Sequence, residues 1–300
     1  MKIIYGVNKI KKFKKPVAAI GVFDGVHRGH KEILESAVRK AREIKGTSIA
    51  VTFWPHPQKE ESVYSLEHRL RLIAELGIDV CVVINFSRHF ARIKAQDFIK
   101  DILVDKICAE YIYVGRNFKF GKNTGGNLAL LNNLGKIYGF KVRSLNIIKA
   151  RGRPISSTLI RSLIRRGKIE EAQRLLCRPV SILGTVIKGT ALGRILGFPT
   201  ANIDPHQEVI PAAGIYAVRI ILGHNKLKGA CYIGTRPTIG RENKRTNVEA
   251  HIFNFNKNIY GKYLEIQFVK RIRLDKKFAN LTSLSKQIRK DVSTVKKILN

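Results

Sequence analysis

The sequence predicts two domains of different fold class, an α/β domain followed by an all-β domain that ends in a helix. Over the first part of the chain, strand-like apolar runs alternate with segments of helical periodicity, as in a parallel sheet wrapped by helices. From Val180 onward the apolar period becomes two, which indicates an antiparallel barrel or sandwich. A chain of 300 residues is long enough for two ordinary domains. We expect them to span residues 1–178 and 179–300.

The first domain is predicted to alternate strands with helices. The strands are expected at 17–20, 48–53, 79–84 and 110–114, and the helices at 29–45, 65–76 and 95–107. Gly77 stops the second helix, and Pro55 and Pro57 close the second strand. Because ligands of such sheets bind beyond the carboxyl ends of the strands, the loops after the first, second and fourth strands are expected to form one site.

The turn from Gly21 to His30 reads Gly-Val-Phe-Asp-Gly-Val-His-Arg-Gly-His and joins the first strand to the first helix. Free N–H groups and the helix dipole favour phosphate there, and Gly25 and Gly29 permit close approach. His27 and His30 are three residues apart, so both can donate hydrogen bonds to charge developing on one phosphorus. Either histidine alone would more often be a solvated or capping residue. A zinc site is disfavoured because no third ligand stands at usable spacing.

The loop after the fourth strand contains Gly115 and Gly121 but does not fit a P-loop. The spacing is one residue too long, and Asn123 stands where serine or threonine would bind magnesium. Asn117 is the candidate polar group of this loop, although an asparagine after a strand is also a common turn former.

Residues 155–161, Ile-Ser-Ser-Thr-Leu-Ile-Arg, are predicted to open another helix, and 167–175 is predicted to form the last helix of the first domain. Ser156, Ser157 and Thr158 at such a start are usually helix caps. Capping and phosphate binding are compatible, because both use the N–H groups at the helix end.

The second domain contains five separate strand candidates, parted by glycine and proline turns, and a terminal helix. The strands are expected at 181–188, 215–222, 227–234, 246–253 and 263–271, and the helix at 281–298.

A candidate magnesium site lies in residues 189–202, which end in Gly-Phe-Pro-Thr-Ala-Asn. Thr200 and Asn202 supply two neutral side-chain oxygens on one side of an extended segment. Mg²⁺ prefers oxygen ligands, and nucleotide phosphates would complete its shell. By residue type alone the indication is weak, since Gly-Phe-Pro-Thr is also an ordinary turn.

A candidate general base is Glu249 in the strand 246–253. Period two places Glu249 and His251 on one face and Val248 and Ala250 on the other. Because a barrel interior is normally apolar, the Glu249 face is expected to open on a ligand cleft. A carboxylate near magnesium-bound ATP could accept a proton from an attacking hydroxyl. Most single glutamates, however, are surface residues in salt bridges.

The composition is that of a globular protein, with 44% hydrophobic and 26% charged residues, but the formal net charge is +34. The basic residues are dispersed, with the densest runs at Lys9–Lys15 and Lys270–Lys277, so we expect only non-specific, salt-sensitive binding to nucleic acid. We expect no membrane span and no secretory signal. The four cysteines form no CxxC pair, which favours the reducing cytoplasm.

These motifs, in their order along the chain, resemble those of the bacterial bifunctional riboflavin kinase/FAD synthetase family. The resemblance covers nearly the whole sequence. It rests on the segments GVFDGVHRGH, TFWPHP, VGRNFKFG, ISSTLIR, GFPTAN, IGTRPT, EAHIFNF and IRLDKKF.

The resemblance implies a Rossmann-like nucleotidyltransferase domain, which adenylates FMN, and a C-terminal antiparallel β-barrel, which phosphorylates riboflavin. ATP, riboflavin, FMN and FAD would be substrates and products, with Mg²⁺ held by Thr200 and Asn202. The catalytic residues would be His27, His30, Asn117 and Glu249. The nucleotide-binding residues would be Gly21, Phe23, Asp24, Gly25, Ser156, Ser157, Thr158, Arg161, Gly189, Gly193, Arg194, Thr200 and Asn202.

Four residues of the second half depart from the family pattern. Asn254 and Asn258 stand where aspartates are common, Tyr232 replaces an asparagine, and Asp275 replaces a glutamate. These departures bear on flavin affinity and kinase efficiency more than on the fold. Three alternatives therefore stay open: an enzyme that keeps only adenylyl transfer, a nucleotidyltransferase for another phosphorylated substrate, and a basic nucleic-acid-binding protein.

Overall fold

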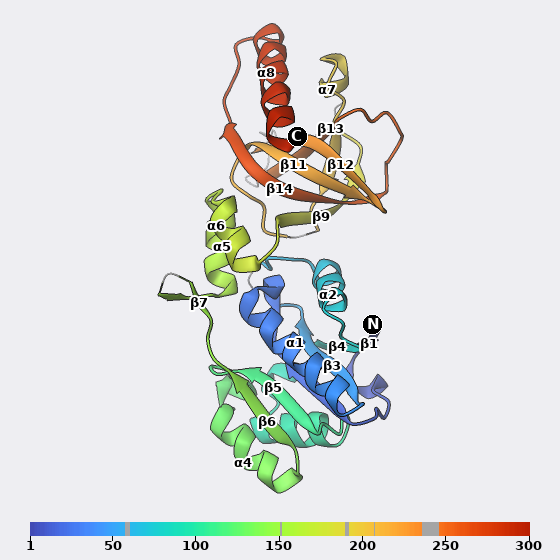
Figure 1. Ribbon diagram of the computed structural model, residues 1–300, viewed down its shortest axis with the longest axis vertical. Helices are drawn as coiled ribbons and strands as arrows, with labels where there is room; N and C mark the ends of the chain where they lie inside the picture. The colour runs from blue at the N-terminus through green and yellow to red at the C-terminus, as the bar shows by residue number, and fades with distance from the viewer. Residues whose placement is uncertain (58–60, 151, 190–191, 207, 236–245) are drawn as a thin grey trace. The chain divides into compact units, whose positions relative to one another are not determined.

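The chain forms two compact units of different architecture (Figure 1). The computed structural model describes residues 1–57, 61–150, 152–189, 192–206, 208–235 and 246–300. The first unit comprises Met1–Ser62 and Leu66–Ser157, and the second comprises Val63–Ser65 and Thr158–Asn300. The predicted boundary at residue 178 concerns independent folding and stays a prediction, which fragments would test. Within the described ranges, no helix is both long and apolar enough to cross a membrane.

The first unit is built on a six-stranded sheet in which all neighbouring strands are parallel, in the order β1-β4-β3-β2-β5-β6. This confirms the predicted α/β class. The strands are β1 (Lys2–Tyr5), β2 (Pro16–Ile20), β3 (Thr47–Trp54), β4 (Val80–Asn85), β5 (Tyr111–Gly115) and β6 (Lys141–Leu145).

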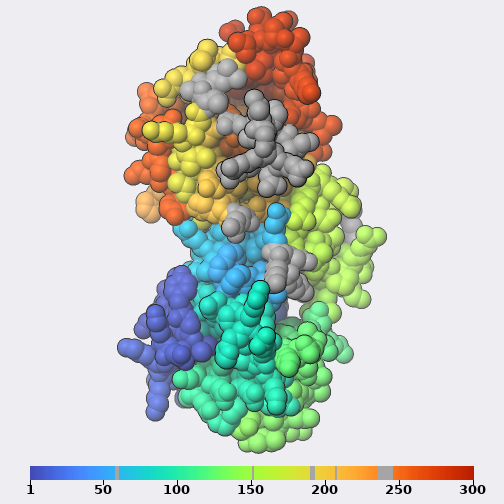
Figure 2. Space-filling view, turned by 180° about the vertical axis from the view of Figure 1, so that it is seen from behind, coloured from blue at the N-terminus to red at the C-terminus, as the bar shows by residue number. Residues whose placement is uncertain are grey.

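The two edge strands, β1 and β6, were not predicted, because most of their residues are exposed and polar residues interrupt their apolar pattern. Figure 2 shows the N-terminal segment, in dark blue, on the surface of the first unit. The central strand β2 is buried along its whole length, which explains why its apolar run was easy to recognise.

The helices of this unit follow the predicted alternation. They are α1 (Arg28–Glu43), α2 (Leu66–Glu75), α3 (Ala95–Asp97), which continues as a π-helix over Phe98–Val104, and α4 (Leu128–Tyr138), which was not predicted. The apolar stripe of α1, with Ile33, Leu34, Ala37 and Ala41 buried, packs on β2, β3 and β5. This packing fixes the start of α1 at the carboxyl end of the central strand β2.

The second unit contains a closed antiparallel barrel with strand order β10-β13-β12-β11-β14-β9, which decides between barrel and sandwich. The strands are β9 (Val180–Ile187), β10 (Ala201–Asp204), β11 (Gly214–Leu222), β12 (Asn225–Thr235), β13 (Thr246–Ile252) and β14 (Tyr263–Leu274). The helices are α5 (Ser157–Arg165), α6 (Ile169–Leu176), α7 (Leu192–Ile195) and α8 (Leu281–Leu299). The predicted terminal helix, α8, packs through Val295 and Leu299 on Ala217 of β11.

The cysteines give a simple test of this burial pattern. All four are unbridged; Cys81 and Cys231 are buried, whereas Cys108 and Cys177 are exposed. Burial raises the pKa of Cys81 to about 12 and also raises the pKa of Cys231. Because the thiolate is the reactive form, a thiol reagent such as DTNB should react rapidly with two thiols in the native protein and with all four after unfolding. Rapid reaction of all four in the native state would contradict the fold.

Candidate active sites

The first candidate site lies on the turn between β2 and α1, as predicted. The chain leaves the sheet after Ile20, forms a 3-10 turn at Asp24–Val26 and enters α1 with His27 as the N-cap residue. Phe23, Gly25 and Val26 have positive φ angles of 51°, 77° and 39°. This tight backbone path brings the N-terminal N–H groups of α1 and the side chain of His27 to the carboxyl edge of the sheet.

The two histidines of this turn form a stacked pair. Their ring centroids are 3.6 Å apart with an angle of 18° between the planes, and His27 is only 6% exposed. The backbone N–H of His30 donates to Nδ1 of His27 at 3.4 Å, so a neutral His27 carries its proton on Nε2. The ring of Phe23 meets His30 edge-on at 5.5 Å. The stack therefore holds an Nε2–H donor at the positive end of a helix.

Gly29 keeps the space beside this stack open. A Cβ atom at position 29 would lie 3.3 Å from Cε1 of His27, which is closer than almost all such contacts. Gly29 therefore also serves close packing against the imidazole of His27, whereas its predicted role in the approach of phosphate stays a prediction.

Asn117 follows β5, which is the direct neighbour of β2 in the sheet. The side chain is exposed, and its Oδ1 would lie 3.5 Å from a Cβ atom at Gly115. Since parallel neighbouring strands end at the same edge, Asn117 and the histidine turn share the carboxyl edge of one sheet.

The segment Ser156–Arg161 divides between the two units. In the first unit, Ser157 Oγ donates to the carbonyl of Asp24 at 2.8 Å, which brings Ser157 to the histidine turn. Ser156 directly precedes α5, at the position expected of a cap. In the second unit, Nη2 of Arg161 donates to Oγ1 of Thr158 at 3.0 Å, and Arg161 is buried. The phosphate-binding roles of these serine, threonine and arginine side chains stay predictions.

The second candidate site lies on the outer face of three neighbouring barrel strands. Asn202 of β10 is paired with Glu249 of β13, which is paired on its other side with Tyr232 of β12. Val248 and Ala250 are 0% exposed, whereas Glu249 is half-buried. The predicted separation of the two faces of β13 is confirmed.

Glu249 is held by two donors. Its Oε2 accepts a hydrogen bond from Thr200 Oγ1 at 2.9 Å, and its Oε1 accepts one from Asn247 Nδ2 at 2.5 Å. The structure thus brings Thr200 and Asn202 together with Glu249, which lies in a separate segment of the sequence. Asn247 was not predicted, although the period of two already puts it on the Glu249 face.

His251 anchors the turn that carries Thr200. Its Nδ1 donates to the carbonyl of Pro199 at 2.8 Å, and its ring meets Phe198 edge-on at 5.6 Å. Gly193 faces the same turn, since a Cβ atom there would lie 3.2 Å from Thr200 Oγ1. This contact of His251 with the turn was not predicted, although the face that His251 shares with Glu249 was.

The remaining predicted glycine and arginine of this segment lie close by along the chain. Gly189 faces the side-chain amide of Asn202, where a Cβ atom would clash. Arg194, in the short helix α7, is exposed. Asn202 itself is 7% exposed, so Gly189 is required for its side chain to fit.

The oxygen donors of this site fit Mg²⁺ chemically. Thr200, Asn202 and Glu249 supply hydroxyl, amide and carboxylate oxygens, which are ligands of hard cations. Among the described residues, no group of three or more His, Cys, Asp and Glu side chains could hold a metal by itself. This is the donor set expected where a substrate's phosphates and water complete the shell.

Two of the four departures from the family pattern contact each other. The hydroxyl of Tyr232 donates to Oδ2 of Asp275 at 3.2 Å. Burial, together with the Asp275 carboxylate, raises the pKa of Tyr232 to about 12, so this phenol stays a donor at neutral pH. Asn258 accepts from the N–H of Tyr260 at 3.1 Å, and Asn254 has a positive φ of 53°. In IGTRPT, residues 236–238 lie outside the described ranges.

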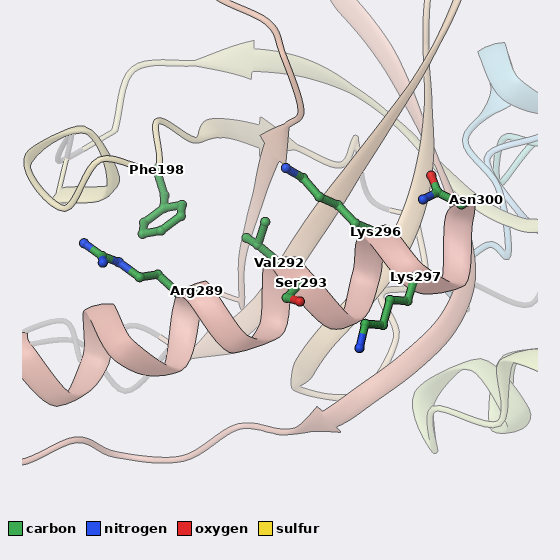
Figure 3. A pocket seen from close by; sticks show the side chains of 7 residues that line it. All are labelled: Phe198, Arg289, Val292, Ser293, Lys296, Lys297 and Asn300. Atoms are coloured by element: carbon green, nitrogen blue, oxygen red, sulfur yellow. The ribbon is translucent and has the colours of Figure 1, made fainter.

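A groove beside this site runs between Phe198 and α8 (Figure 3). Its volume is about 400 Å³, and in the close-up the Phe198 ring stands opposite the helix. Its other lining residues come from α8 and are mostly basic or polar: Arg289, Val292, Ser293, Lys296, Lys297 and Asn300. The lining thus combines one aromatic ring with three basic side chains, which suits a ligand that is both planar and anionic.

Comparison with known proteins matches the two parts of the chain to two enzyme families. Residues 9–159 match the family model of FAD synthetase, and residues 176–299 match that of riboflavin kinase. The bifunctional riboflavin kinase/FMN adenylyltransferase of Buchnera aphidicola subsp. Schizaphis graminum is 36% identical over 310 residues, covering 100% of this chain and 99% of the relative. The Escherichia coli K12 protein of the same name is 35% identical, covering 99% of this chain and 97% of the relative.

A solved structure resembles the whole chain. A crystal structure described as a macrolide-efflux protein from Streptococcus pneumoniae has a TM-score of 0.86 at 28% sequence identity. It covers 97% of this chain, and this chain covers 97% of it.

Proposed function

Since the chain belongs to the bifunctional riboflavin kinase/FMN adenylyltransferase family, we propose that it makes FAD from riboflavin in two ATP-dependent steps. The barrel part would transfer the γ-phosphoryl group of ATP to riboflavin, giving FMN and ADP. The sheet part would transfer AMP from another ATP to FMN, giving FAD and pyrophosphate. The observation that carries this proposal most directly is the stacked His27–His30 pair at the N-terminus of α1.

In adenylyl transfer, the FMN phosphate attacks the α-phosphorus of ATP while the bond to pyrophosphate breaks. The Nε2–H of His27 would donate to an oxygen on the α-phosphorus, and His30, stacked on it, would add a second donor. The N-terminal N–H groups of α1 would bind the neighbouring phosphate oxygens. The side-chain amide of Asn117, at the same sheet edge, would orient a substrate. Positioning and charge stabilisation suffice, with no covalent enzyme intermediate.

In the kinase step, Glu249 would accept the proton of the riboflavin ribityl hydroxyl as that oxygen attacks the γ-phosphorus. The bonds from Thr200 and Asn247 fix both carboxylate oxygens, so the base is oriented before substrate binds. Mg²⁺ held near Thr200 and Asn202 would neutralise charge on the nucleotide phosphates. The basic groove along α8 offers a surface for the anionic substrate beside this base.

The coproducts distinguish the proposal from its alternatives. With riboflavin and ATP, the purified chain should release ADP; with FMN and ATP, it should release pyrophosphate in a one-to-one ratio with FAD. Pyrophosphate release without any ADP would reduce the chain to an adenylyltransferase. If neither ADP nor pyrophosphate is released, and the purified chain does not retain bound ATP in moderate salt, the nucleic-acid-binding alternative would be favoured.

Fragments test the proposed domain boundary. A fragment of residues 1–178 should make FAD from FMN, and one of residues 179–300 should phosphorylate riboflavin. The second is expected to be less stable than the intact unit, because it lacks α5 and α6, of which α6 packs on β9 and β14. In addition, the buried Glu208 would lose the N–H and Oγ donors of Ser65, at 3.0 and 2.7 Å. The loss of the Ser65 donors alone should cost about 1–3 kcal/mol, the usual price of removing a partner from a buried polar group.

Thermal unfolding of the barrel fragment measures the combined loss, and Ser65→Ala in the full-length chain isolates the part that comes from the hydroxyl. Insolubility of both fragments would show that the two parts share a core and would refute the boundary.

The cellular setting follows from the same chemistry. We propose a cytoplasmic location, because ATP is the cosubstrate of both steps and all four cysteines are unbridged. The partners would be small molecules.

A further inference from the structure

A buried arginine lies behind the turn that carries the histidine pair. Arg69 belongs to α2, and its side chain is 0% exposed. Burying a guanidinium is costly unless its charge and its donors are satisfied. The groups that accept hydrogen bonds from Arg69 therefore indicate which part of the fold this residue stabilises.

Those partners belong to the turn and to the end of the neighbouring strand. Nη1 donates to the carbonyl of Val22 at 2.9 Å and to the carbonyl of Phe53 at 3.3 Å. Nη2 donates to Ser62 Oγ at 3.4 Å and lies 3.8 Å from Oδ1 of Asp24. One guanidinium thus joins the start of the turn to the last residues of β3.

The backbone that this guanidinium holds is strained. Directly after Val22, Phe23, Gly25 and Val26 have positive φ angles, which is unusual for a bulky or β-branched residue. Such a path persists only where the surroundings hold it in place. The carbonyl of Val22 accepts a second hydrogen bond, from Thr52 Oγ1 at 2.8 Å.

The turn also contains a buried anion. Asp24 is 1% exposed, and its carboxylate would repel phosphate groups bound at the same turn. Arg69 opposes this charge from 3.8 Å. Burial lowers the pKa of the Arg69 guanidinium, and the nearby Asp24 carboxylate raises it. The carboxylate thus helps to keep the buried guanidinium charged.

We propose that Arg69 is a positioning residue for adenylyl transfer, which holds the Gly21–His30 turn through the Val22 carbonyl and balances the charge of Asp24. Arg69 would not touch the substrate itself, but it would set where His27 and His30 meet the α-phosphorus. The inference rests on the proposed adenylyl transfer and assigns that site a residue which no motif indicated.

The test compares Arg69→Lys, Arg69→Met and the control Arg71→Met. Arg71 lies on the same helix and pairs with Glu75 at 3.4 Å on a solvent-accessible face. The kcat and KM of FAD formation are measured together with the number of ATP sites per chain. Riboflavin phosphorylation by the same preparation is recorded as the internal control.

Arg69→Met should lower kcat for FAD formation by about tenfold to a hundredfold, the scale of a displacement near 1 Å at a reacting group. The KM values for ATP and FMN, the ATP stoichiometry and riboflavin phosphorylation should stay close to those of the unaltered chain. Arg69→Lys keeps the charge but not the forked geometry, so its kcat should lie between that of Arg69→Met and that of the unaltered chain. Arg71→Met should resemble the unaltered chain.

Thr52→Val keeps the test decisive if Arg69→Met does not fold. It removes the other side-chain donor to the Val22 carbonyl with little change of shape, and it should lower kcat several-fold without changing the ATP stoichiometry.

Unchanged kcat in Arg69→Lys and Thr52→Val would overturn the inference, as would a fall in kcat that only follows a fall in the number of ATP sites. Absence of FAD formation by the unaltered chain would instead overturn the proposed function itself.

Discussion

Replacing His27 by alanine is expected to lower the turnover of FAD formation from FMN by about a hundredfold or more, the usual scale for losing one donor to developing charge. His30→Ala is expected to have a similar effect, because the two rings are stacked at 3.6 Å and act on the same phosphorus. FMN formation from riboflavin should continue at its normal rate. Initial rates with saturating ATP and either FMN or riboflavin measure both effects.

The matched control for these variants is His89→Ala. His89 is exposed, lies in the same unit and makes no capping hydrogen bond with its side chain. It should leave both activities unchanged. If His27→Ala or His30→Ala abolished both activities together, the histidines would serve folding and the catalytic assignment would be wrong.

Glu249→Gln is expected to lower riboflavin phosphorylation by roughly a hundredfold or more, within the range of general-base effects. The amide keeps the shape of the side chain and can still accept from Thr200, so binding should change less than turnover. FAD formation from supplied FMN should be untouched, because no residue of the histidine turn is altered.

Glu170→Gln is the control for this variant, since Glu170 is an exposed glutamate of the same unit. Both substitutions remove one carboxylate, so a general charge effect would appear in both. Near-normal FMN formation by Glu249→Gln would refute the assignment of Glu249 as the base.

The sequence was most informative where one face of an element is buried. The runs of β2 and β3 and the stripe of α1 predicted a parallel sheet, because burial imposes a pattern on each of them. The edge strands β1 and β6 carry no such pattern. Strand β10 spans only Ala201–Asp204, too short for a period of two to be recognised. Strand order depends on crossovers between distant segments, which periodicity does not contain.

The candidate sites show the same division. Thr200 and Glu249 were selected by residue type and motif, and their hydrogen bond confirms that the chain brings them together. Arg69 was missed because an arginine in a helix is normally solvated, and nothing in its local sequence marks a 0% exposed guanidinium. Glu208 was missed for the same reason, since its partners Ser65 and Leu183 are far away in the chain.

The most direct test of the central claim, that one chain performs both steps, is a time course with riboflavin, ATP and Mg²⁺ followed by chromatography of the flavins. FMN should appear first and FAD should follow, with no added protein. The His27→Ala variant should accumulate FMN, whereas the Glu249→Gln variant should make FAD only when FMN is supplied. Riboflavin that stays unchanged, or supplied FMN that is never converted to FAD, would contradict the central claim.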